Sequence, residues 1–199
     1  MLLYYSIQLK LNGSIEMQIN QTDIPGVLII EPKRRADSRG FFLETFRADK
    51  FIALDLPDPF VQDNWSRSAL GVLRGLHLQY PNPQSKLITV VTGRVLDVAV
   101  DVRIGSPTYG RHVAVELSDD NGRQFLIPRG FAHGFLALSE SVDLFYKCDN
   151  YYSPADEITI RWSDPALGIA WPMSNPTISP RDASAPMLAD IKRLPSFAG

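Results

Sequence analysis

Short runs of β-branched and aromatic residues recur along most of this chain, with turn signals between them. The runs occupy residues 27–30, 41–46, 60–64, 87–91, 94–102, 112–117, 124–127, 135–138, 143–147 and 157–160. Turn-forming segments such as 104–107 and 120–122 separate several of them. Short strands at this spacing are typical of an all-β sandwich or barrel. Helical spacing is confined to residues 48–54 and 185–192, so we expect only short peripheral helices.

The composition is that of an ordinary globular domain. With 199 residues, of which 45% are hydrophobic and 21% charged, the chain is long enough for one compact core. The 20 basic and 22 acidic residues nearly balance, which gives no overall attraction to nucleic acid or to a membrane surface. Cys148 is the only cysteine, so an intrachain disulfide is excluded and a reducing compartment is expected. We therefore predict a cytoplasmic protein without a nucleic-acid or membrane partner.

The first sixteen residues differ from the rest of the chain. They begin with apolar residues but lack the basic leading region and the small-residue cleavage pattern of a secretory signal. A strand-rich segment begins at Met17. We expect residues 1–16 to be a loosely ordered extension, introduced by the choice of start site, and residues 17–199 to form a single cupin-type epimerase domain on the grounds given below.

Two glycine-spaced segments, each with one histidine, give the strongest functional signal. The second, residues 122–133, has the spacing Gly-x5-Pro-x-Gly-x2-His and ends at His133. This spacing resembles the second motif of the cupin family, whose members fold as jelly-roll β-barrels. The first segment, residues 71–93, resembles the family's first motif, and His77 stands at the position of its first histidine.

Two positions of the first motif hold residues that do not suit a metal ion. Gln79 stands where a metal-binding cupin has its second histidine ligand, and Lys86 stands where it has a glutamate ligand. A cation at a ligand position repels a metal ion and reverses the electrostatics of the site. The resemblance therefore implies a cupin-type jelly-roll barrel with no metal, built for an anionic charge.

The residue types in these segments suit proton transfer at carbon. Arginine, glutamine and lysine surround His77 in the sequence, which an apolar core would not tolerate unpaired. A histidine held neutral by an acidic partner can remove a weakly acidic carbon-bound proton. An ammonium group such as that of Lys86 stabilises a developing enolate oxygen. Tyr146, Tyr151 and Tyr152 offer a proton donor and a base-stacking platform, and their spacing does not choose between them.

Four planar hydrogen-bond donors suit a phosphate ligand. Arg39 and Arg74 lie in separate strand-like segments, and Gln62 and Asn64 lie together in a third. Arginine matches the geometry of phosphate oxygens, and the two amides add further donors. The sequence has no glycine-rich phosphate loop that opens a helix, which excludes Walker-type and dinucleotide-binding folds. A diphosphate ligand would explain the set.

A series of motifs stands in order along most of the chain. They are Asp-x-Arg-Gly-x-Phe-x-Glu at 37–44, Gln-x-Asn-x-Ser at 62–66, Leu-Arg-Gly-Leu-His-x-Gln at 73–79, Asp-x3-Asp-x-Arg-x2-Ser-Pro-Thr-Tyr-Gly at 97–110, Pro-x-Gly-Phe-Ala-His-Gly-Phe at 128–135, Tyr-Lys at 146–147, and Trp-x-Asp-Pro with Ile-x-Trp-Pro at 162–172. Together they resemble the dTDP-4-dehydrorhamnose 3,5-epimerase family over about residues 24–191. The resemblance implies an isomerase of dTDP-L-rhamnose biosynthesis that inverts both carbons beside the ketone of a dTDP-4-keto-6-deoxyhexose, without metal or cofactor.

The resemblance also implies a role for each matching residue. His77 would abstract the proton and Asp182 would orient the histidine. Tyr146 would return a proton on the opposite face, while Lys86 would hold the enolate oxygen. The expected substrate-binding residues are Arg39, Glu44, Gln62, Asn64, Arg74, His133, Tyr152, Glu157 and Arg181. Of these, Glu44 would lie near the thymine, Tyr152 would stack on it, and Arg181 stands where a lysine is common.

Members of this family form homodimers in which a strand crosses to the partner and carries an arginine into its active site. The resemblance therefore implies a homodimer with shared active sites. It leaves open whether Arg39 serves its own chain or the partner.

Three further functions compete with double epimerisation. A related dTDP-4-keto-6-deoxysugar 3-epimerase, 5-epimerase or ketoisomerase would carry the same motifs, because loop shape sets the stereochemistry of the sugar. A sugar-nucleotide-binding cupin without catalysis would have no need for His77, Lys86, Tyr146 and Asp182 together. A metal-dependent cupin oxygenase is disfavoured by the lysine at the ligand position.

Overall fold

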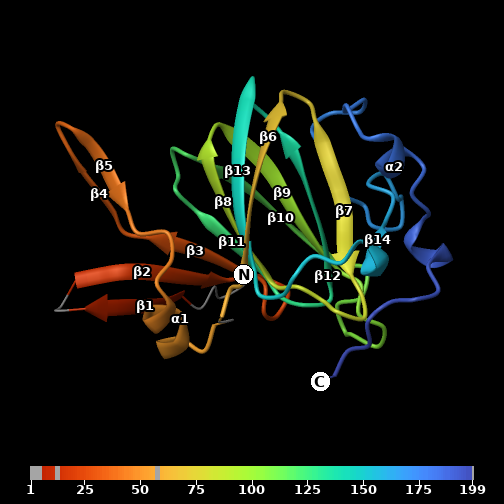
Figure 1. Cartoon of the computed structure of the whole chain (residues 1–199), viewed down its shortest axis with the longest axis horizontal. Coiled ribbons are helices and arrows are strands. Elements are labelled where there is room, and N and C mark those ends of the chain that lie inside the picture. The colour runs from red at the N-terminus through yellow and green to blue at the C-terminus, as the bar shows by residue number, and fades with distance from the viewer. Residues whose placement is uncertain (1–5, 12–13, 57–58, 199) are drawn as a thin grey trace.

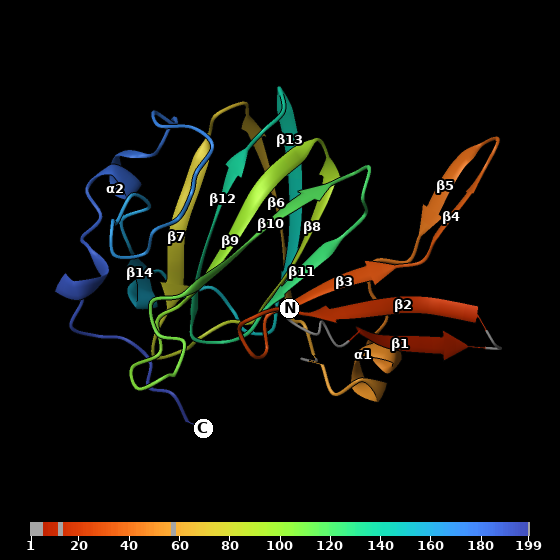
Figure 2. The same cartoon turned by 180° about the vertical axis from the view of Figure 1, so that it is seen from behind.

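The computed structural model describes residues 6–11, 14–56 and 59–198. Two antiparallel sheets form the body of the molecule, as Figure 1 and Figure 2 show from opposite sides. The larger sheet has seven strands in the order β1-β2-β3-β11-β8-β13-β6, and the smaller has five in the order β10-β9-β12-β7-β14. Strands that are distant in sequence are neighbours in both sheets, as in a jelly roll. The predicted all-β, cupin-like jelly-roll fold is confirmed.

The strands and helices have the following bounds. The seven-stranded sheet contains β1 (Ser6–Leu11), β2 (Ser14–Gln21), β3 (Leu28–Pro32), β11 (Gln124–Ile127), β8 (Lys86–Thr92), β13 (Ser141–Cys148) and β6 (Gln62–Ala69). The five-stranded sheet contains β10 (His112–Ser118), β9 (Arg94–Asp101), β12 (Phe131–Ala137), β7 (Leu73–Gln79) and β14 (Glu157–Thr159). Outside the sheets lie the hairpin β4 (Arg34–Asp37) and β5 (Gly40–Leu43), the helices α1 (Ala48–Ala53) and α2 (Pro180–Ala183), and the 3₁₀ turns η1 (Pro154–Asp156) and η2 (Leu188–Asp190). Every strand run predicted from the sequence overlaps one of these strands.

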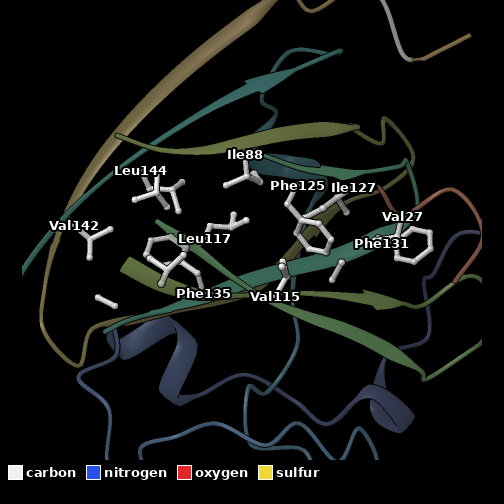
Figure 3. Packing of buried hydrophobic residues seen from close by; sticks show 14 of the residues in the cluster. Val27, Ile88, Val115, Leu117, Phe125, Ile127, Phe131, Phe135, Val142 and Leu144 are labelled. Atoms are coloured by element: carbon white, nitrogen blue, oxygen red, sulfur yellow. The ribbon is translucent and has the colours of Figure 1, made fainter. Parts of the chain in front are cut away.

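The hydrophobic core lies between the two sheets (Figure 3). Ile88, Phe125 and Leu144 contribute to it from the larger sheet. Leu117 and Phe135 meet them from the smaller sheet. Burial of one side chain of this size contributes about 1.5–3 kcal/mol relative to its exposed state. The core therefore holds the two sheets at a fixed separation, with their inner faces toward each other.

Side-chain alternation places polar residues in the same inward-facing rows as the core. Successive residues of a strand face opposite sides of the sheet. On β8, Lys86 shares a face with Ile88 and Val90, which both belong to the core between the sheets. On β9, Asp97 shares a face with Ala99 of the same core. Lys86 therefore faces into the barrel.

The C-terminal segment covers the outer face of the five-stranded sheet. Leu76 and Leu78 of β7 cluster with Leu167, Leu188 and Leu194, apart from the core between the sheets. Helix α2 lies beside β7 in both views (Figure 1, Figure 2), and Leu188 of η2 belongs to the same cluster. This segment thus buries the outer leucines of β7, while the next side chains along the strand face inward.

The helix predicted at residues 185–192 is wrong. This stretch contains only the 3₁₀ turn η2, because Pro186 disfavours the helical conformation at Ala185. A short helix, α2, forms just before it instead. Its N-cap is Ser179, whose hydroxyl accepts a hydrogen bond from the backbone N–H of Asp182, and Pro180 occupies its first position.

The N-terminal segment is more ordered than expected. Residues 6–11 form β1, which pairs with β2, and β2 itself begins at Ser14, so the predicted boundary at residue 17 falls inside a strand. The alternating sequence of residues 6–11 explains the strand, because Leu9 packs on a cluster that contains Met17, Ile19 and Phe51. Residues 1–5 and 12–13 lie outside the described residues. The start-site origin of the extension stays a prediction.

The β4–β5 hairpin projects away from the barrel (Figure 1, Figure 2). Its side chains are largely exposed, and Phe41 and Phe42 are 53% and 65% accessible. Exposed aromatic residues on a projecting hairpin suit contact with another protein surface. Among the described residues, no helix is long and apolar enough to cross a membrane.

Candidate active site

A cavity of about 460 Å³ lies at the polar end of the inward-facing rows. All four predicted catalytic residues line it: His77, Lys86, Tyr146 and Asp182. A second hollow of about 320 Å³ shares His77, Lys86 and Tyr146 with the first, so the two are parts of one site. The second part contains most of the predicted binding residues, namely Gln62, Asn64, Tyr152, Glu157 and Arg181.

The two histidines of the cupin-like motifs are neighbours across strands β7 and β12, where His77 pairs with His133. The register shifts directly beyond this pair, as in a β-bulge. Gly75 lies in the shifted stretch at a φ of +113°, and a Cβ there would lie 2.6 Å from the backbone of Gly134. Only glycine permits this approach of the two strands. The close contact brings both histidine side chains to one cavity.

His77 forms a hydrogen bond with the buried Asp182. The distance between His77 Nε2 and Asp182 Oδ1 is 2.6 Å, and Asp182 is 3% exposed. Burial tends to raise the pKa of Asp182, but the hydrogen bond and the charge of His77 outweigh it, so the pKa is lowered. An ionised carboxylate only accepts hydrogen bonds, so His77 must donate from Nε2 and keep its lone pair on Nδ1. This arrangement suits a general base.

Tyr146 faces the same cavity from the other sheet. It lies on β13, beside Ile88 of β8, whereas His77 lies on β7 of the five-stranded sheet. Burial raises the pKa of Tyr146, so its hydroxyl keeps its proton at neutral pH. A base on one wall and a proton donor on the other can act on the two faces of a planar intermediate.

Lys86 lines both parts of the cavity. Burial lowers its pKa, while the nearby Asp97 and Glu157 carboxylates oppose this effect. A lysine ammonium in such a site can stabilise an oxyanion more strongly than one in water, because the local dielectric is low.

The rim of the cavity is rich in hydrogen-bonding side chains. Arg74 donates from Nε to Ser68 at 3.0 Å, and Gln62 donates to Asn64 at 3.1 Å. These contacts hold the planar groups in place beside the cavity that they line. They can serve a bound anion without a large change of conformation.

A second group of binding candidates forms a connected network. Glu157 accepts hydrogen bonds from the Tyr152 hydroxyl at 2.5 Å and from Arg181 at 2.6 Å. Burial tends to raise the pKa of Glu157, but these donors lower it overall. The ring of Tyr152 remains half exposed, as a stacking platform requires.

Two predicted binding residues lie outside the cavity of their own chain. Arg39 sits at the tip of the β4–β5 hairpin and pairs with Asp37 at 2.6 Å. Glu44 follows β5 and pairs with the buried Lys50 at 2.5 Å. The structure therefore brings seven of the nine predicted binding residues to the cavity region and carries the other two on or next to the projecting hairpin.

The sequence interpretation overlooked residues that take part in the site. Asp97 accepts a hydrogen bond from His133 at 2.9 Å, and Ser66 lines the cavity with a buried hydroxyl that has no partner among the described residues. Asp97 interrupts an otherwise apolar strand, a position where a carboxylate needs a buried partner. That interruption was a usable signal. Ser66 offered none beyond its place in the Gln-x-Asn-x-Ser motif.

A jelly-roll barrel with a carboxylate-paired histidine, a tyrosine and a lysine around one polar cavity belongs to the class of cupin-like carbohydrate epimerases. Residues 21–190 match the model of the dTDP-4-dehydrorhamnose 3,5-epimerase family. The chain belongs to this family.

Similar proteins support the assignment over most of the chain. A dTDP-4-dehydrorhamnose 3,5-epimerase of Salmonella typhimurium is 51% identical over 175 residues, which cover 86% of this chain and 96% of the relative. The crystal structure of dTDP-6-deoxy-D-glucose-3,5-epimerase from Legionella pneumophila, in complex with dTDP-4-keto-L-rhamnose, is 50% identical. It has a TM-score of 0.90, and the match covers 92% of this chain and 100% of the Legionella chain. A 3'-monoepimerase from Streptomyces bikiniensis, in complex with dTDP-quinovose, is 39% identical with a TM-score of 0.83. That match covers 88% of this chain and 91% of the Streptomyces chain.

Proposed function

We propose that this protein inverts C3 and C5 of dTDP-4-keto-6-deoxyglucose, the epimerisation step that leads to dTDP-L-rhamnose. The observation that carries the proposal is the His77–Asp182 pair at 2.6 Å, in one cavity with Tyr146 and Lys86. The names of the Salmonella and Legionella relatives support the substrate class.

The chemistry follows from the acidity of carbons beside a ketone. The Nδ1 lone pair of His77 accepts the proton from C3 or C5, and Asp182 stabilises the imidazolium that forms. The electron pair moves onto the ketone oxygen as an enolate, which the Lys86 ammonium stabilises. Tyr146 then donates its proton to the same carbon from the opposite face, which inverts the centre. The two proton-transfer groups return to their starting states by exchange with solvent.

The remaining candidates would hold the nucleotide and sugar. Arg74, Gln62 and Asn64 offer donors to the diphosphate or sugar, and His133 and Glu157 offer further contacts. Tyr152 has the exposed ring that stacking on thymine requires. Arg181, already fixed by Glu157, adds a positive charge at the rim.

We also propose a homodimer with shared sites. Arg39 and Glu44 match binding positions of the family but lie at or near the projecting hairpin, away from the cavity of their own chain. A hairpin that reaches a second copy would bring both residues to the partner's cavity. Its exposed Phe41 and Phe42 would then be buried.

A second candidate function is inversion of only one carbon. The 39% identity with a 3'-monoepimerase favours it, because the same barrel and the same motifs occur in a protein named for a single inversion. Whether one carbon or both are inverted depends on how the sugar is held relative to His77.

Proton NMR of dTDP-4-keto-6-deoxyglucose with the enzyme in deuterated water distinguishes these functions. Deuterium at both C3 and C5 is the expected result, since each inversion exchanges the carbon-bound proton with solvent. Deuterium at one of the two carbons would replace the proposal with monoepimerisation. No exchange, with nucleotide still bound, would identify a binding protein or an enzyme with another substrate.

A further inference from the structure

Asp97 is a buried carboxylate behind the cavity wall, and the proton-transfer mechanism above does not use it. It is fully buried on β9, where Oδ1 accepts a hydrogen bond from His133 Nε2 at 2.9 Å. Its Oδ2 has no hydrogen-bond partner among the described residues. A buried carboxylate with an unpartnered oxygen is costly unless a positive charge lies nearby.

Lys86 is a cation in the inward-facing row of β8, on the sheet that faces the inward-facing row of β9 with Asp97. Three groups oppose the loss of its charge: Cys148, Asp97 and Glu157. Burial raises the pKa of the Cys148 thiol to about 11, so Cys148 is uncharged at neutral pH. Glu157 already forms an ion pair with Arg181 at 2.6 Å. Asp97 is therefore the carboxylate whose charge remains available to Lys86.

His133 receives a second effect from Asp97. Burial lowers the pKa of His133 and favours its neutral form, while the negative charge of Asp97 opposes this effect. An ionised Asp97 accepts but cannot donate, so His133 must carry its hydrogen on Nε2. The Nδ1 atom is then left as a hydrogen-bond acceptor. One carboxylate thus influences two side chains that line the cavity.

Other titratable or charged groups face the same cavity from neighbouring elements. They are Arg74 and His77 of β7, Tyr146 and Cys148 of β13, Tyr152, Glu157 of β14, and Arg181 and Asp182 of α2. Asp182 is engaged by His77, as Glu157 is by Arg181. Asp97 is the remaining carboxylate, and it accepts its hydrogen bond from His133.

We propose that Asp97 is a positioning residue that supplies the countercharge of the Lys86 ammonium and fixes the ring of His133 through its Nε2 hydrogen. The inference rests on the proposed function, because the charge of Lys86 serves catalysis only if Lys86 stabilises an enolate. Asp97 itself is not among the residues that line the cavity.

The substitution Asp97→Asn tests the charge, because asparagine keeps the shape and an acceptor oxygen. The chain has six lysines, so selective ¹³C labelling at Cε gives six signals, and Lys86→Ala identifies that of Lys86. In Asp97→Asn the titration midpoint of Lys86 should fall by about one pH unit or more. The fall of kcat at high pH should then begin at a lower pH by a similar amount, while KM stays near the wild-type value. An unchanged midpoint would overturn the proposal.

Asp101→Asn is a matched control. Asp101 is also fully buried on β9, in the same row as Asp97, but its carboxylate binds Arg103 at 2.7 Å. Four residues of strand separate the two acids by roughly 13 Å. The control should leave the Lys86 midpoint unchanged. An equal shift in both variants would mean that any lost buried charge has this effect, and would overturn the specific role of Asp97.

The wild-type protein provides a measurement that does not depend on whether Asp97→Asn folds. The chain has three histidines, so long-range ¹H–¹⁵N spectra can assign the tautomer of each. His133 should carry its hydrogen on Nε2, and Lys86 should be charged at neutral pH. An Nδ1–H tautomer or an uncharged Lys86 would contradict the proposal. Neither measurement needs substrate, so failure of the wild-type enzyme to epimerise would contradict the proposed function alone.

Discussion

At the scale of single residues, the proposed base and the proposed proton donor lie on different sheets. His77 belongs to the five-stranded sheet and Tyr146 to the seven-stranded sheet, and both face one cavity. His77→Ala removes the proposed base, and Tyr146→Phe removes one hydroxyl without changing the ring. Each should lower kcat by about 10²–10⁴-fold, the usual contribution of general acid–base catalysis, and leave dTDP binding close to normal.

Steady-state rates together with calorimetric titration of dTDP check this expectation. Tyr151→Phe is the matched control, since Tyr151 is 68% exposed and lines neither part of the cavity. It should keep wild-type activity. A His77→Ala enzyme that still turns over at the normal rate would rule out the mechanism.

The sequence predicted some site residues better than others for a physical reason. His77 and Lys86 stand at fixed spacings from glycines in a recognisable motif, so their inward orientation followed from local pattern. The pairing of His77 with Asp182 joins residues 105 positions apart, and it was expected only through the family resemblance. The role of Asp97 depends on which strand lies beside β9. No local pattern reports that neighbour.

At the scale of elements, the segment after β9 depends on one buried acid. Asp101 Oδ2 accepts hydrogen bonds from Ser106 at 2.6 Å and Thr108 at 2.7 Å, in addition to the Arg103 ion pair. Burial tends to raise the pKa of Asp101, but these donors lower it to about 2. The difference from the usual aspartate pKa of 3.8 corresponds to about 2 kcal/mol of stability when the acid is ionised.

Asp101→Asn should therefore lower the free energy of unfolding by about 2 kcal/mol at pH 7. The folded-state pKa lies below the unfolded one, so the stabilisation is complete above about pH 4 and disappears as the pH falls toward 2. Urea unfolding of wild type and variant at pH 7, 4 and 3 measures the difference between their free energies of unfolding. A difference that is constant over this range would show that lost packing, and not ionisation, explains the destabilisation.

Element prediction succeeded where local alternation and burial coincide, as in the strands that form the core. It failed at residues 185–192, where helical spacing was counted but Pro186 breaks the helix. It also undervalued residues 6–11, whose alternation was present but whose partner strand lay in the next segment. The first error came from a proline inside the segment, and the second from interpreting a segment without its partner strand.

At the scale of the whole molecule, the barrel carries seven of the nine proposed binding residues, and the other two lie on or next to the hairpin. The β4–β5 hairpin projects away from the body in both views (Figure 1, Figure 2). A single chain thus places Arg39 far from the cavity that contains His77. The sequence motif around Arg39 indicated a binding role but not which copy it serves, because that depends on an assembly and not on local structure.

Mixed dimers test whether the hairpin serves the partner. If Arg39→Ala and His77→Ala chains are unfolded together and refolded as a mixture, half of randomly assembled dimers contain one chain of each kind. In those dimers one of the two sites combines an intact His77 with an intact Arg39 from the other chain. The mixture should recover about a quarter of wild-type activity, although each parent alone is inactive.

A mixture of His77→Ala and Tyr146→Phe chains is the control, because both residues line the cavity of one chain and no mixed site is intact. No recovery in either mixture would mean that Arg39 acts within its own chain. Recovery in the control as well would mean that the regained activity does not come from a site shared through Arg39.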